Sequence, residues 1–420
     1  MIFKLFNYLK NNNIPFFISN GYKEIVSIVN TESDIDIVLK KEHFKKIEKI
    51  LIEFCEITDI KMVQVLNHDL WAKNIFLFNP KDAKYLNLDL YGELSRKDIL
   101  FFPEKETFNT IQFYKDIPIL STEKEFISYL IKKLDKNEVS EKNFKYLHSL
   151  YVKEPLLCDK TLEIFFPQKY KIISDGFRKN NFNLLNKSKK KLVLDFSSLK
   201  KINITKVISN GLRIIKRIFY PTGINIAFLG SDGSGKSTII DNILKNRFPF
   251  RRKDYFHLKP LIIKESPSKK EIISDPHKHP SYSQIKSYLK LLYFIYQYNM
   301  GWIKNISPLK IKSSLVIFDR YFDDILIDTK RYRYGGGLTI VKIARLFIPK
   351  PELYFILTAD AKVIYERKQE VEFSELERQI SAYRALGDNK QYFNIDVNRT
   401  PEEITEEITT IIMEKMNERY

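Results

Sequence analysis

Gly230-Ser-Asp-Gly-Ser-Gly-Lys-Ser-Thr238 matches the phosphate-binding pattern G-x-x-x-x-G-K-[ST] at every position. The apolar run Ile224-Asn-Ile-Ala-Phe-Leu229 precedes this loop and predicts a buried parallel strand. Ser237-Thr-Ile-Ile-Asp-Asn-Ile-Leu-Lys245 follows it, with apolar residues at helical spacing. A strand, a glycine loop and a helix in this order predict a phosphate-binding loop. A glycine-rich turn that binds nothing is the alternative.

The predicted loop would hold a nucleotide, because backbone N–H groups and a helix N-terminus can surround a phosphate. Lys236 would contact the β- and γ-phosphates, and the Ser237 hydroxyl would hold Mg²⁺. The residues expected to bind the nucleotide are Gly230, Ser231, Gly233, Ser234, Gly235, Lys236, Ser237 and Thr238.

The 420-residue chain is too long for one ordinary core, so we expect domains at residues 1–121, 122–221 and 222–420. The net charge of +18 favours polyanionic partners: nucleotides, nucleic acid or an anionic membrane surface. A general richness in Lys, Ile and Asn explains much of this excess. Only two cysteines occur, which excludes a disulfide framework. No signal peptide or bilayer-spanning apolar run is visible, so we expect a cytoplasmic protein.

The C-terminal part has the alternation of apolar runs and helical patterns that predicts an α/β fold with a doubly wound parallel sheet. Helices are expected at 283–303 and 361–368, and a last helix should begin after Thr400 as N-cap, with Pro401 in its first turn. The expected strands are residues 225–229, 255–258, 315–319, 353–357 and 392–397.

Leu315-Val-Ile-Phe-Asp-Arg-Tyr321 places two charges at the carboxyl end of a predicted strand, where open α/β sheets bind ligands. Asp319 is a candidate for holding Mg²⁺, and Arg320 is a candidate for pairing with a phosphate. A surface Asp–Arg pair that merely ends a strand is the alternative.

Together with the loop, the Asp319-Arg320-Tyr321 triplet and the acidic residue Asp232 resemble the thymidylate kinase family of P-loop kinases. The resemblance covers residue 223 to the C-terminus and implies ATP and Mg²⁺ as cofactors. It also implies that Asp232 contacts the acceptor's sugar hydroxyl. Residues 361–368 resemble the family's lid helix, with Arg367 as the first candidate for contacting the transferred phosphate and Lys368 as the second. The predicted catalytic residues are Lys236, Asp232, Asp319, Arg320 and Arg367.

The segment Tyr255-Phe-His-Leu-Lys-Pro260 departs from this family. The family carries an arginine-containing loop there, which grips the acceptor phosphate, whereas this chain offers His257 and Lys259 and then a long insert. The departure puts a thymidine substrate in doubt. Tyr332-Arg-Tyr-Gly-Gly-Gly337 either lines the acceptor site or forms a turn after a helix.

The N-terminal part contains Thr31-Glu-Ser-Asp-Ile-Asp-Ile-Val-Leu39, in which Asp34 and Asp36 would face one side of a strand. Two aligned carboxylates suit a Mg²⁺ ion. With Gly21 and Asp89 they resemble the nucleotidyltransferase fold of the DNA polymerase β type, an α+β fold, over residues 14–102. The resemblance implies metal binding by Asp34, Asp36 and Asp89. An edge strand with solvent-facing acids is the alternative, and the family's Gly-Ser pair is missing.

The middle part is expected to be mostly helical and basic, with Asn186-Lys-Ser-Lys-Lys-Lys191 as a solvated turn. Residues 204–219 carry apolar and basic side chains at helical spacing. Such a helix could lie on an anionic membrane, but we expect it to pack its apolar face on a neighbouring domain.

A chain that combines these two parts is similar to a bacterial group of proteins whose genes lie beside surface-polysaccharide synthesis genes. This implies an Mg²⁺-dependent kinase that moves the γ-phosphoryl group of ATP to a sugar, glycan or lipid-linked acceptor. Asp34, Asp36 and Asp89 would either carry a second, nucleotidyltransferase reaction or only hold a nucleotide. A nucleoside monophosphate kinase, a scaffold with decayed sites, and a nucleotide-gated nucleic-acid-binding protein are the alternatives. Nucleic acid is the least favoured partner because no RNA-binding or zinc-finger signature occurs. The acceptor and the oligomeric state stay open.

Overall fold

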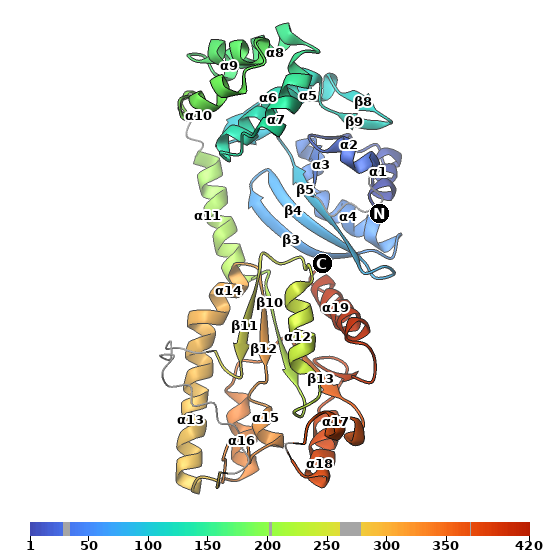
Figure 1. The fold of residues 1–420 in the computed structure, drawn as a ribbon, viewed down its shortest axis with the longest axis vertical. Coiled ribbons are helices and arrows are strands. Elements are labelled where there is room, and N and C mark those ends of the chain that lie inside the picture. Colours follow the sequence, from blue (N-terminus) through green and yellow to red (C-terminus); the bar gives the residue numbers. More distant parts are fainter. Residues whose placement is uncertain (28–33, 201–203, 261–278, 370) are drawn as a thin grey trace. The chain divides into compact units, whose positions relative to one another are not determined.

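The computed structural model describes residues 1–27, 34–200, 204–260, 279–369 and 371–420. The chain divides into two compact units (Figure 1). The first comprises Met1–Arg213 with Arg419–Tyr420, and the second comprises Ile214–Glu418. Each unit is described by itself.

The first unit contains a mixed seven-stranded sheet in the order β3-β4-β5-β2-β1-β9-β8. Strands β2 and β5 run parallel, and their register places Asp36 opposite Asp89. The sheet strands are β1 (Phe16–Ile18), β2 (Ile35–Leu39), β3 (Lys61–Asp69), β4 (Ala72–Asn79), β5 (Lys84–Tyr91), β8 (Gln112–Tyr114) and β9 (Ile117–Ile119), with a separate hairpin of β6 (Ser95–Arg96) and β7 (Ile99–Leu100).

The first unit has an apolar core between the sheet and helices, and a further core formed mainly by helices. One core joins the sheet to the first helices, and the other gathers side chains between Ile99 and Phe196. The Lys-rich segment 186–191, expected as a turn, lies inside helix α10, so that prediction was wrong. The helices are α1 (Ile2–Asn11), α2 (Tyr22–Ser27), α3 (Lys41–Lys45), α4 (Ile47–Glu56), α5 (Glu104–Asn109), α6 (Thr122–Asp135), α7 (Glu141–Tyr151), α8 (Pro155–Phe165), α9 (Tyr170–Arg178) and α10 (Phe182–Ser197).

Helix α11 (Ile204–Phe219) forms where the sequence predicts it, but its orientation differs from the expectation. We expected its apolar face to be packed, whereas its one buried residue is Lys206 and its apolar side chains are exposed. Among the described helices, none is long and apolar enough to cross a bilayer.

The second unit is built on a five-stranded parallel sheet in the order β11-β12-β10-β13-β14. The parallel sheet and its five strands are confirmed. Every residue of β10 and β13 is buried, as the uninterrupted apolar runs indicate. The strands are β10 (Ile224–Leu229), β11 (Arg252–His257), β12 (Ser314–Asp319), β13 (Leu353–Thr358) and β14 (Tyr392–Asp396).

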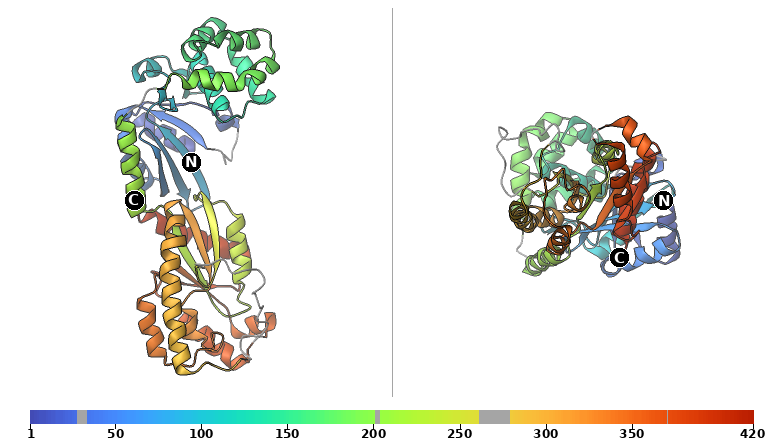
Figure 2. Two further views of the ribbon diagram at one scale, coloured as in Figure 1. Left: turned by 90° about the vertical axis from the view of Figure 1, so that its left-hand side faces the viewer. Right: turned by 90° about the horizontal axis from the view of Figure 1, so that it is seen from below.

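Helices cover both faces of this sheet (Figures 1 and 2). The last one begins as predicted, because Thr400 and Glu403 form a reciprocal capping box and Pro401 occupies the first turn. The helices are α12 (Lys236–Lys245), α13 (Gln284–Gly301), α14 (Ser307–Ile311), α15 (Asp324–Ile327), α16 (Leu338–Leu346), α17 (Ala361–Arg367), α18 (Phe373–Arg384) and α19 (Pro401–Asn417), with a π-helical turn at Trp302–Ile306.

Candidate active site

The glycine-rich loop connects the central strand β10 to helix α12, as the sequence predicts. Gly230 has a φ of 141°, and a Cβ atom there would lie 2.5 Å from the Leu357 carbonyl oxygen. Gly235 caps α12 with a φ of 85° in the left-handed region. Both positions therefore require glycine, and the loop brings its N–H groups to the start of α12.

The Lys236 side chain folds back onto this loop. Its Nζ donates to the carbonyl oxygens of Gly230 at 2.9 Å and Ser231 at 2.8 Å. The side chain is buried, and burial together with the Arg320 charge lowers the pKa of Lys236 to about 7. An ammonium group so poorly solvated would gain from a nearby phosphate, which supports its predicted role.

Asp319 ends β12 at the same sheet edge, and its carboxylate fits the predicted metal role. Its Oδ2 accepts a hydrogen bond from the Tyr255 hydroxyl at 3.2 Å. Its Oδ1 is buried and has no hydrogen-bond partner within the described residues. Ser237 is exposed in the first turn of α12. A buried, unsatisfied carboxylate oxygen and an accessible hydroxyl are oxygen donors of the kind that Mg²⁺ prefers.

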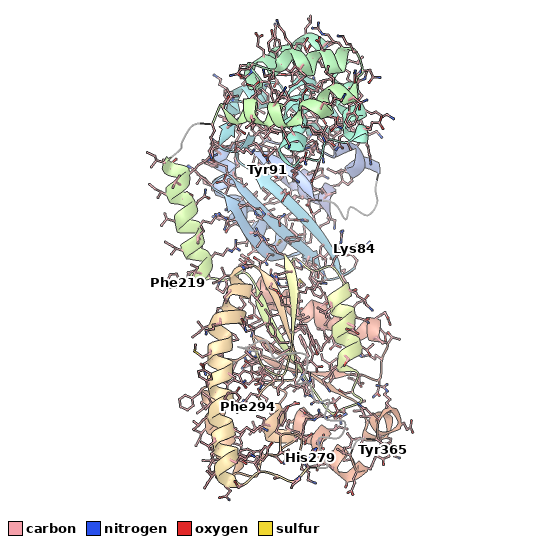
Figure 3. All side chains as sticks on the ribbon, turned by 60° about the vertical axis from the view of Figure 1, so that its left-hand side comes forward. Lys84, Tyr91, Phe219, His279, Phe294 and Tyr365 are labelled. Carbon is pink, nitrogen blue, oxygen red and sulfur yellow. The ribbon has the colours of Figure 1, made fainter. Side chains whose placement is uncertain are left out.

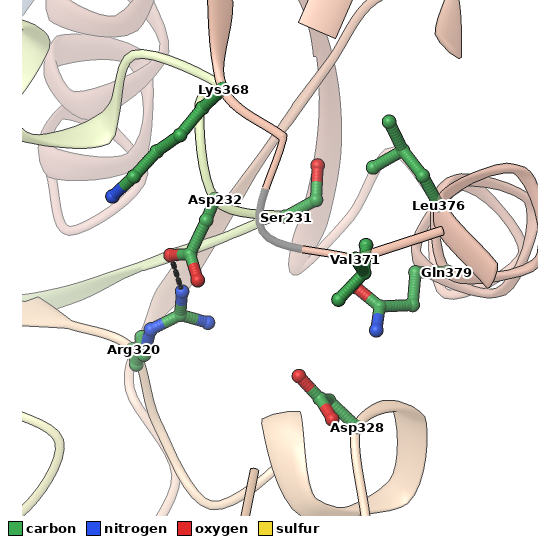
Figure 4. A pocket seen from close by; sticks show the side chains of 8 residues that line it. All are labelled: Ser231, Asp232, Arg320, Asp328, Lys368, Val371, Leu376 and Gln379. Atoms are coloured by element: carbon green, nitrogen blue, oxygen red, sulfur yellow. Dashed lines mark hydrogen bonds and ion pairs between the residues drawn. The ribbon is translucent and has the colours of Figure 1, made fainter. Parts of the chain in front are cut away.

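Arg320 is held in place by two carboxylates, Asp232 and Asp324 (Figure 4 shows the first pair). Its backbone has a φ of 70°, and its N–H donates to the Phe228 carbonyl oxygen at 2.9 Å. This backbone turn directs the guanidinium toward the loop, where it also donates to the Gly230 carbonyl oxygen. Arg320 thus joins the end of β12 to the phosphate-binding loop.

Asp324 is a supporting residue that the sequence analysis missed. It is completely buried, and besides Arg320 it accepts hydrogen bonds from the hydroxyls of Tyr383 at 2.8 Å and Tyr332 at 3.3 Å. Its position only four residues after Arg320 in the chain was the available signal. Asp324 fixes the direction of the Arg320 side chain.

The loop acid Asp232 lines a small pocket (Figure 4). A second arginine, Arg331, pairs with its carboxylate, and sequence reasoning missed this contact. Of the two lid candidates, Lys368 lines the pocket, whereas Arg367 lies exposed at the end of α17. The pocket is lined by Ser231, Asp232, Arg320, Asp328, Lys368, Val371, Leu376 and Gln379.

Three cations gather beyond the carboxyl end of β11. Lys259 donates to Gln297 Oε1 at 2.7 Å, and Lys290 donates to the Tyr332 carbonyl oxygen. Arg333 donates to a backbone carbonyl oxygen of the neighbouring loop. Burial, together with the charges of Lys259 and Arg333, lowers the pKa of Lys290 to about 8. Lys290 and Arg333 donate to neutral carbonyl oxygens, so an anionic ligand would be favoured beside them. Residues 261–278, which contain most of the predicted insert, lie outside the described part of the chain.

The N-terminal carboxylates meet on β2 and β5, but each has a partner within the protein. Lys132 Nζ lies 2.8 Å from Asp36 Oδ2, and the Asn87 amide donates to Asp34. The Asn74 amide donates to Asp89 Oδ1 at 2.6 Å. Burial raises the pKa of Asp89, and the charges of Asp36 and Asp34 raise it further.

In this arrangement the three carboxylates are paired with side chains of the protein. Within the described residues, no group of three or more acidic, histidine or cysteine side chains could hold a metal ion. The ammonium of Lys132 supplies the positive charge that Mg²⁺ would bring to Asp36. The metal at Asp34, Asp36 and Asp89 stays a prediction, and an ion there would have to displace Lys132 from Asp36.

Comparison with known proteins supports the prediction for the second unit. A probable thymidylate kinase from Methanosarcina barkeri is 27% identical over 208 residues, which cover 45% of this chain and 95% of that protein. This similarity supports the predicted ATP-dependent phosphotransferase activity. Thymidylate kinase-like kinases use ATP and Mg²⁺, and the similarity to these P-loop kinases extends over about 45% of this chain.

Two solved structures of thymidylate kinases are also similar to this chain. The enzyme from Ehrlichia chaffeensis shares 18% identity and a TM-score of 0.33, covering 46% of this chain and 99% of its own. The enzyme from Candida albicans shares 20% identity and a TM-score of 0.35, covering 47% of this chain and 93% of its own. No protein-family model matches the chain.

Proposed function

We propose that the second unit transfers the γ-phosphoryl group of ATP to the phosphate of a nucleoside monophosphate. The observation that carries the proposal is the meeting of Lys236, Asp319 and Arg320 at one edge of a parallel sheet. The similarity to a thymidylate kinase supports a nucleotide acceptor better than the sugar, glycan or lipid-linked acceptor expected from the sequence. That acceptor class is the second candidate in the experiment below.

The charge of each residue determines its proposed role in phosphoryl transfer. The loop N–H groups and Lys236 would stabilise the negative charge that spreads over the transferred phosphoryl oxygens. Asp319 and Ser237 would hold Mg²⁺, which supplies further positive charge between the phosphates. Arg320 is fixed by Asp232 and Asp324, so it needs little reorganisation to meet a phosphate. Arg367 and Lys368 are the lid candidates, of which Lys368 lies nearer the loop.

The cluster of Lys259, Lys290 and Arg333 supports an acceptor that already carries a phosphate. It lies after β11, and the register of β11 with β12 puts both strand ends at the same edge. A phosphate bound there would approach the same edge as the γ-phosphate of ATP. A neutral sugar hydroxyl would be attracted less strongly by these cations than a phosphate would.

The test is a coupled assay of ATP consumption with a panel of nucleoside monophosphates, dTMP and dUMP first, followed by sugar and lipid-linked glycan acceptors. We expect turnover with at least one monophosphate, and a loss of about 10²–10³-fold in Lys236→Ala. Lys245→Ala, at the exposed end of the same helix, is the matched control and should keep full activity. Transfer to a sugar with no monophosphate accepted would overturn the proposed acceptor. Full activity of Lys236→Ala would overturn the site.

A further inference from the structure

Helix α11 exposes a continuous apolar face. Ile204, at its first residue, is 69% exposed, and Phe219, at its last, is 75% exposed. Figure 3 draws the side chains of α11 as sticks and labels Phe219 at the end of the helix. The exposed apolar residues of the helix are Ile204, Val207, Ile208, Leu212, Ile214, Ile215, Ile218 and Phe219.

The polar face of the same helix points toward the protein. Lys206 is buried and pairs with Glu93 at 2.9 Å. In the first unit, Arg213 donates to the Asn67 carbonyl oxygen at 2.7 Å. In the second unit, Arg217 donates to the Ile311 carbonyl oxygen. Basic side chains therefore hold the helix against the protein, and its apolar side chains face outward. An ordinary surface helix has the opposite arrangement, with its apolar face toward the core.

The width of this face helps to decide what covers it. At 3.6 residues per turn, the eight side chains spread over an arc of about 160°, along a helix of about 24 Å. A single partner helix would cover a narrower a/d stripe. A wide apolar face suits the boundary of a lipid layer, into which such helices sink by about 5–10 Å.

The charge of the helix favours an anionic surface. Residues 204–219 contain four basic residues and no acidic one. Lys216 is exposed and lies beside the apolar arc, where it can reach headgroups. Each basic residue near an anionic bilayer adds attraction. The net charge of +18 acts in the same direction.

From this apolar face and these charges we infer that α11 is a membrane-surface helix, which docks the protein on an anionic lipid bilayer through its outward apolar side chains. The helix lies in the interface and does not span it. Phosphoryl transfer would then take place beside a membrane, whichever acceptor the second unit uses.

The experiment is co-sedimentation of the full-length protein with vesicles of phosphatidylcholine alone and of phosphatidylcholine mixed with phosphatidylglycerol. We expect binding to the mixed vesicles, and at least about tenfold weaker binding by the double variant Ile208→Asp with Ile215→Asp. Lys216→Glu should weaken binding to the mixed vesicles several-fold, because it reverses one charge. Leu289→Asp with Leu292→Asp on α13 is the matched control, since both residues are similarly exposed, and it should bind like the wild type.

Folding of each variant is checked by its thermal unfolding and by its kinase activity without vesicles, which should match those of the wild type. Failure of the wild type to bind either vesicle would overturn the inference, as would equal losses in the α11 and α13 variants. Light scattering without lipid gives a further test. A wild-type dimer that becomes a monomer in the α11 double variant would show that a second copy covers the face, which also overturns it.

Discussion

Replacement of Asp324 by alanine tests whether Arg320 is held by a buried acid. Asp324 is completely buried, Arg320 is 5% exposed, and the two side chains pair directly. Removing one partner of a buried ion pair leaves the other charge uncompensated, which costs about 3–5 kcal/mol. The hydroxyls of Tyr332 and Tyr383 also lose their acceptor, at about 1 kcal/mol each or more. Asp232 still pairs with Arg320 and limits the loss, so we expect about 4 kcal/mol in total.

The assay is urea denaturation followed by tryptophan fluorescence. The chain has two tryptophans, Trp71 in the first unit and Trp302 in the second. In a Trp71→Phe background, the signal of Trp302 alone reports the unfolding of the unit that contains Asp324. The control is Glu407→Ala, which removes the acid of the exposed pair with Arg399 and should cost less than about 1 kcal/mol. If Asp324→Ala lowers the free energy of unfolding by no more than this control does, the argument for a buried anchor fails.

Three further predictions concern the phosphate-binding site and the stability of helix α19. Because the pKa of Lys236 is about 7 in the free protein and a bound phosphate raises it, ATP binding above pH 7 should take up as much as about one proton and weaken as the pH rises. Calorimetry at pH 8 in buffers of different ionisation enthalpy measures this uptake, which Lys236→Met should abolish. Asp319→Asn should raise the Mg²⁺ concentration for half-maximal activity by about tenfold or more, since an amide replaces a charged ligand, and a Mg²⁺ titration of the rate would show it. Thr400→Ala removes a capping box and should lower the free energy of unfolding by about 1 kcal/mol in urea, whereas Thr410→Ala, inside the same helix, should change it little.

The strands and the loop of the second unit could be predicted because each is marked by residues that are close together in the sequence. The apolar runs at β10 and β13 are long enough to identify buried strands, and the loop pattern locates the phosphate site between β10 and α12. Thr400 and Pro401 mark a helix start by their side-chain chemistry alone.

The partners of the charged residues were not predictable, because they come from distant parts of the chain. Arg331 reaches Asp232, and Tyr383 reaches Asp324, only after the strands and helices have packed. The direction of the apolar face of α11 also depends on packing with distant residues. Its helical period is therefore visible in the sequence, but the direction of this face is not. Lys132 is 96 residues from Asp36, so the alternating carboxylates alone could not show that an ammonium group pairs with one of them.

That ammonium has a consequence for how the first unit behaves in the cell. The occupancy of a divalent-ion site depends on the concentration of the ion, and chelators remove the ion. A lysine side chain is part of the polypeptide, so its charge is present in every folded copy. The positive charge beside Asp36 is therefore supplied by the chain itself and does not depend on the magnesium concentration.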